Sequence, residues 1–283
     1  MESGDNLYPI TPSKEQQHDD KYHHPPVGTG SSASCGGRVE RGRAADNYAG
    51  GGPAAAPAIE QEAVDALEKM GNYLRSLNTF TIQAETAKDE VLEDGRKLQF
   101  DRQLDIAVSR KDGLRVHGRA ALRNRNFYYD GSTFTLYSPD THYYASFPAP
   151  ATIPETLDAA DIKFGITLPL ADIFYWGTER APVDDIQKAM VVGPGLVRGV
   201  ECTHYAYSKP DVDWQLCIQP GDKPLPLKLV ITTTAEPEQP QYAAVMQWEL
   251  APAFKEGTFT FAPPPEAAKI SFQTQGESTQ SRN

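Results

Sequence analysis

The sequence has little of what defines several protein classes, and each shortage excludes one of them. Only three cysteines occur among 283 residues, at Cys35, Cys202 and Cys217. This number fits neither a disulfide-rich scaffold nor a four-ligand zinc site, so we predict no bound metal. No stretch approaches the roughly 18 apolar residues that a membrane-spanning helix needs, so we predict no transmembrane segment.

Signals for export and for catalysis are also missing. The first residues, Met-Glu-Ser-Gly-Asp-Asn, lack the basic and apolar regions of a secretory signal peptide. The chain has no Gly-x-Ser-x-Gly elbow, phosphate-binding loop, dinucleotide fingerprint or His-Glu-x-x-His motif. We therefore predict that the protein is not an enzyme and needs no cofactor.

The balance of charge is acidic. The formal net charge is −11, and the acidic residues are scattered along the chain instead of gathering in a tail. This balance repels polyanions, so we predict no nucleic-acid partner, and an anionic membrane surface is a poor target for the same reason.

Composition divides the chain into three parts. Residues 1–57 carry Gly-, Ser- and Pro-rich runs with almost no regularly spaced apolar residues. Such a segment cannot bury enough apolar surface to offset its conformational entropy. We predict a disordered leader over residues 1–57, a single β-rich domain over 58–272 and a disordered tail over 273–283.

Apolar spacing predicts one helix followed by many strands. In residues 59–77 apolar side chains recur every three or four positions, which is typical of an amphipathic helix. From Thr79 the spacing changes to two, and turns such as Asp94-Gly95 and Asp130-Gly131 separate the alternating runs. Pro-rich residues 148–190 interrupt this pattern and predict short helices at 155–164, 170–176 and 184–190. We count about ten strands, the last at 258–261, and three or four helices.

The alternation also predicts the fold class, mainly β (α+β). Most strands have one apolar and one polar face, as antiparallel sheets with one buried side do. Because a sheet of about ten strands tends to curl, we expect a curved antiparallel sheet, an incomplete β-barrel. Helices 59–77 and 154–176 should cover its concave face.

Several segments resemble a bacterial family of predicted periplasmic proteins, the domain-of-unknown-function family 2092. These segments lie, in the same order, at Asp65–Leu77, Gly95–Phe100, Phe127–Gly131, Leu168–Gly177, Gly199–Tyr205, Asp213–Gln215 and Pro224–Thr233. The family is similar in architecture to the lipoprotein carriers LolA and LolB, in which helices plug an incomplete barrel whose cavity accepts acyl chains. The resemblance implies a LolA-like fold and a location in the periplasm or cell envelope.

Two cysteines in the domain leave two interpretations open. If Ser208 pairs with Asp211 around a turn at Lys209-Pro210, Cys202 lies opposite Cys217 at a distance that a disulfide can span. The alternative is two buried, reduced thiols. The neighbouring His204 lacks a third group to orient it, so we predict no catalytic triad here.

Strand parity predicts which side chains point toward the concave interior. We expect Trp214 and Trp248 to lie at the mouth of a cavity, with their indole N–H groups toward water. The candidate cavity residues are Leu67, Met70 and Leu74 from the helix and Phe100, Leu104, Ile106, Val116, Leu136, Trp214, Leu216, Leu229, Met246 and Trp248 from the strands.

These features together predict a non-catalytic cell-envelope protein that binds an apolar or lipid-like small molecule, as a carrier or chaperone-type module. One alternative is a structural or protein-interaction module whose interior is filled by its own side chains. A second alternative is an unrecognised hydrolase. The sequence identifies neither the ligand nor a protein partner.

Overall fold

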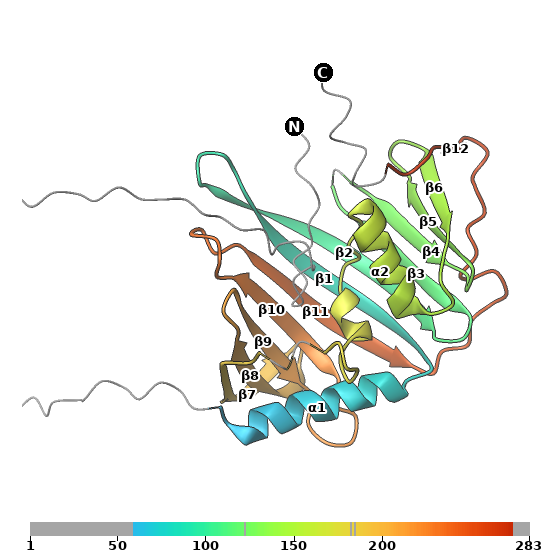
Figure 1. The fold of residues 1–283 in the computed structure, drawn as a ribbon. Coiled ribbons are helices and arrows are strands. Elements are labelled where there is room, and N and C mark those ends of the chain that lie inside the picture. The colour runs from blue at the N-terminus through green and yellow to red at the C-terminus, as the bar shows by residue number, and fades with distance from the viewer. Residues whose placement is uncertain (1–58, 122, 182, 184, 274–283) are drawn as a thin grey trace, which may run out of the picture. The chain divides into compact units, whose positions relative to one another are not determined.

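The fold consists of one large, curved, open β-sheet with two α-helices, seen in a computed structural model (Figure 1). The structure describes residues 59–273 except 122, 182 and 184. The predicted leader and nearly all of the predicted tail lie outside these residues. Helix α1 spans Gln61–Ser76, helix α2 spans Ile153–Phe164, and a 3-10 turn, η1, spans Ala171–Phe174.

Twelve strands form the sheet within the described residues, two more than the sequence predicts. They are β1 (Thr79–Val91), β2 (Lys97–Ser109), β3 (Gly113–Arg119), β4 (Arg125–Tyr129), β5 (Thr133–Ser138), β6 (Tyr143–Pro148), β7 (Lys188–Val197), β8 (Val200–Ser208), β9 (Val212–Ile218), β10 (Pro226–Thr233), β11 (Gln241–Leu250) and β12 (Ala268–Lys269). Their order is β12-β6-β5-β4-β3-β2-β1-β11-β10-β9-β8-β7, and all neighbours are antiparallel except β12 and β6. Two meanders therefore meet where β1 pairs with β11.

Helix α1 confirms the predicted amphipathic pattern. Its buried residues Ala63, Leu67, Met70, Gly71 and Leu74 recur every one to four positions along one face. The helix lies beside β7, where the Glu60 N–H donates to the carbonyl of Ala189. The 3-10 turn η1 contacts both helices, so the three elements form one helical layer (Figure 1).

The strand pairing confirms that one face of the sheet is buried. The register places Ile82 beside both Ile106 and Trp248, and it places Val116 beside Ile106. We call the face that carries these side chains the inner face, and the opposite one the outer face. The inner face and both helices contribute to a single apolar core.

Two predicted elements are wrong. Residues 185–187 are not helical, and β7 begins at Lys188, because this segment pairs with β8 along the edge of the sheet. Residues 258–261 form turns instead of a strand. In this segment Phe259 is buried, and Phe261 packs on the outer face against Tyr128, Tyr137 and Tyr144, with ring centroids 5.0–5.3 Å apart. These aromatic side chains therefore pack without strand pairing.

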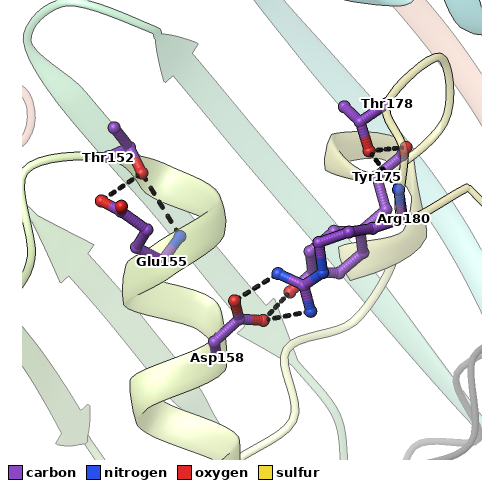
Figure 2. Close-up of polar contacts among 6 residues, drawn as sticks. All are labelled: Thr152, Glu155, Asp158, Tyr175, Thr178 and Arg180. Carbon is purple, nitrogen blue, oxygen red and sulfur yellow. Dashed lines mark hydrogen bonds and ion pairs between the residues drawn. The ribbon is translucent and has the colours of Figure 1, made fainter.

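Polar contacts fasten α2 to the segment that follows it (Figure 2). The Thr152 hydroxyl caps the helix by accepting from the Glu155 N–H. Farther along, Asp158 forms an ion pair with Arg180 and accepts from the Tyr175 hydroxyl at 2.9 Å. The Arg180 guanidinium lies 4.5 Å from the centre of the Tyr175 ring, and burial raises the pKa of this tyrosine.

Candidate functional site

The predicted cavity residues lie together, as the packed core of the protein. Ten of the thirteen are buried: Leu67, Met70, Leu74, Leu104, Ile106, Val116, Trp214, Leu216, Leu229 and Met246. Leu136 and Trp248 are partly buried and pack against the same core. The structure therefore brings twelve of the thirteen together in one apolar core.

Phe100 is the exception, because 43% of its surface is exposed. Its parity is as predicted, since it has the same parity in β2 as Leu104 and Ile106. The prediction of burial is wrong for a reason that parity cannot show. Residues 97–101 lie at the end of the long β1–β2 hairpin and are exposed on both faces of the sheet, beyond the region where the core is packed (Figure 1).

The prediction for the two tryptophans is also wrong. Trp214 is only 1% exposed and stacks on Tyr207 with ring centroids 5.2 Å apart. Trp248 packs against Phe80, and its indole N–H donates to the carbonyl of Pro226 at 2.8 Å instead of pointing to water. The Trp248 N–H is therefore bonded within the protein, and the Trp214 indole is buried instead of lying at the mouth of a cavity.

Three polar groups are buried in this core without a hydrogen-bond partner of normal geometry among the described residues. They are the indole N–H groups of Trp176 and Trp214 and the hydroxyl of Tyr242. Burial, and after it the negative charge of Asp172, raises the pKa of Tyr242, which keeps this phenol protonated. A buried group left unpaired costs about 1–3 kcal/mol, and most such groups in proteins meet water or a ligand.

A pocket of about 200 Å³ opens where α1 meets the inner face of β8 and β9. Ala66 and Lys69 of α1 form one side, and the loop after β9 closes another because the Lys69 ammonium donates to the Gly221 carbonyl at 2.9 Å. The lining residues are Ala66, Lys69, Thr203, Tyr205, Ile218, Gln219, Pro220, Gly221 and Pro224. Tyr205 and Ile218 belong to the core, so the pocket borders the apolar core directly.

None of the thirteen predicted residues lines this pocket. Parity could have included Ile218, which alternates with Trp214 and Leu216 along β9. Lys69 and the loop residues could not be found this way. The loop has no periodic pattern, and it lies next to the helix only because the chain folds to bring these distant segments together.

The pocket shows no constellation for acid–base or metal chemistry. Lys69 is the only charged residue in its lining, which contains no carboxylate, histidine or thiol. In the described ranges, no group of three or more His, Cys, Asp or Glu side chains is arranged to hold a metal ion. No helix in this part of the chain combines the length and apolar character needed to cross a membrane.

The two domain cysteines are joined by a disulfide, but in a different register from the predicted one. His204, not Cys202, lies opposite Cys217, because the turn centres on Pro210 and Asp211, one residue later than predicted. Proline favours the first central position of such a turn and is disfavoured at the second. The disulfide lies on the outer face above Gly195, where a Cβ atom would come within 2.8 Å of the Cys217 sulfur.

Comparison with protein families gives one match that covers most of the domain. The model of a family described as predicted periplasmic proteins, DUF2092, matches residues 63–273. The chain belongs to this family. Membership assigns the protein to the periplasm or cell envelope, in agreement with the resemblance in the sequence. No curated protein sequence matches the chain.

Several solved structures are similar to this family member at low sequence identity. LprF from Mycobacterium bovis is 12% identical, with 74% of this chain and 99% of LprF covered and a TM-score of 0.44. The lipoprotein LppX from Mycobacterium tuberculosis is 7% identical, with 69% and 98% covered and a TM-score of 0.42. A LolA superfamily protein from Nitrosomonas europaea is 10% identical, with 70% and 97% covered and a TM-score of 0.35. Similarity at this level transfers no ligand.

Proposed function

We propose that the protein is a non-catalytic module of the cell envelope that holds an apolar or lipid-like molecule between the helical layer and the inner face of the sheet. In this proposal α1, α2 and η1 cover the concave side of the incomplete barrel. The single observation that carries the proposal is the pocket beside α1, since its floor of Tyr205 and Ile218 is part of the apolar core.

The size of the pocket limits what it can hold in the present conformation. At about 200 Å³ the pocket is smaller than the roughly 300–1,000 Å³ of typical ligand pockets, so it can hold only a head group and a short chain. A longer chain would have to separate α1 from the core side chains below it.

Lipid extraction and native mass spectrometry of the purified protein test this proposal. We expect an acyl-containing molecule to co-purify and to be displaced by added detergent. Replacing Ala66 with methionine should fill the pocket and reduce the bound fraction several-fold, whereas Ala151→Met, at an exposed position outside the pocket lining, should leave it unchanged. A protein that never retains or binds any amphiphile would refute the proposal.

The structural or interaction module remains the second candidate, favoured by the close packing of the core. Nine of the ten buried candidate residues are no more than 2% exposed, among them Met70 and Leu216, so the described side chains already fill most of the interior. The two candidates differ in one measurement, since only a binding module is stabilised against heat by added amphiphile. For the hydrolase we expect no turnover of an ester panel.

A further inference from the structure

We infer that the ligand of the pocket beside α1 carries an anionic head group, which Lys69 binds. This inference rests on the proposed function and adds the chemical class of the ligand. The protein as a whole has a net charge of −11, which repels anions. A cation at the pocket therefore makes this one place selective for anionic ligands.

The position of Lys69 at the mouth of the pocket is defined by one contact. Its ammonium donates to the Gly221 carbonyl at 2.9 Å, which holds the side chain against the loop after β9. A lysine ammonium has three N–H donors and no acceptor. The contact with Gly221 uses one donor, so two can serve an anionic oxygen in the pocket.

A second wall of the pocket offers further donors. Thr203 and Tyr205 are two residues apart on β8, so both point to the inner face, where Thr203 pairs with Ile218 and Tyr205 with Leu216. Tyr205 is only 8% exposed, yet its hydroxyl makes no hydrogen bond to any residue that the structure describes. The phenol is therefore placed to donate to a head group that Lys69 attracts.

The remaining walls explain why the ligand should be an amphiphile instead of a free inorganic anion. Ala66, Ile218, Pro220 and Pro224 are apolar and lie next to the polar groups. Pockets that combine apolar walls with a few placed polar groups bind molecules of the same mixed character. A carboxylate or a phosphate ester on an aliphatic chain meets both requirements, and both present the anionic oxygens that Lys69 binds.

The experiment compares three probes with the same chain and different heads: octanoate, octyl phosphate and octanol. Binding to the full chain is followed by tryptophan fluorescence or calorimetry. We expect at least one anionic probe to bind about tenfold or more tightly than octanol, because hydrogen bonds to charged groups are the stronger ones. The preferred anion distinguishes a fatty-acid source from a phospholipid source, and its affinity should fall as salt is added.

Variants assign the selectivity to one side chain. Lys69→Gln should weaken binding of the preferred anion about tenfold and leave octanol unchanged, and Lys69→Arg should restore most of the loss. Lys228→Gln removes an exposed lysine of β10 that does not line the pocket and should change nothing. If the protein binds octanol and both anions equally and ignores Lys69→Gln, the inference is wrong and the proposed function stands. If no probe binds and no lipid co-purifies, both fail.

Discussion

The backbone contact between Gly71 and Gly177 makes a sharp prediction about the helical layer. A Cβ atom on Gly71 would lie 2.5 Å from the Gly177 nitrogen and 2.9 Å from its Cα, whereas ordinary contacts begin near 3.4 Å. Gly71→Ala must therefore open the contact between α1 and the segment after η1 by about 0.9 Å, the difference between 3.4 and 2.5 Å. This movement also stretches the hydrogen bond that the Arg75 guanidinium donates to the Gly177 carbonyl.

Two effects of opposite sign decide the size of the change. Overpacking costs about 1–3 kcal/mol, and the upper end applies here because the obstacle is backbone, which cannot change rotamer. Alanine improves the helix by about 1 kcal/mol over glycine. We expect a net loss of about 2 kcal/mol in the free energy of unfolding, seen as a drop in Tm of about 4–8 °C in a thermal melt.

The control is Asn72→Ala, one residue along the same helix at an exposed position. It has the gain in helix propensity without the clash, so it should raise the free energy of unfolding by up to about 0.7 kcal/mol. If Gly71→Ala stabilises the protein as Asn72→Ala does, α1 and Gly177 do not approach each other as closely as the structure shows.

Two further predictions concern the disulfide and the buried phenols. The Cys202–Cys217 disulfide closes a loop of 15 residues. Reduction, or a double Cys→Ser variant, should therefore lower the free energy of unfolding by about 3 kcal/mol. Thiol labelling of the unreduced, unfolded protein should modify Cys35 alone, because it is the one cysteine outside the disulfide. Free thiols at both positions would contradict this. Burial raises the pKa values of Tyr175, Tyr207 and Tyr242, so the folded state favours the protonated phenols. The free energy of unfolding should therefore be unaffected by these groups below the ordinary tyrosine pKa near 10 and should fall as the pH rises above it. Ultraviolet titration should show these phenols ionising only as the protein unfolds, and a normal titration of all tyrosines in the folded state would refute the burial.

The sequence by itself determined which face of each strand is buried and where the first helix lies. Leu104, Ile106 and Val116 are buried because side chains alternate between the faces of a strand, so a local pattern is enough to identify the apolar side. Leu67, Met70 and Leu74 follow in the same way from helical spacing. These patterns also predicted the curved antiparallel sheet, since a long sheet with one apolar face must curl over its core.

Only the tertiary structure decided which of these positions are covered and where space remains. Phe100 has the inward parity of its strand and is still exposed, because coverage depends on how far the packed core reaches along the hairpin. The pocket depends on Lys69 of α1 meeting Gly221, 152 residues later in the chain. Local periodicity carries no information about such contacts, because they arise when distant segments pack together and not from the conformation of either one.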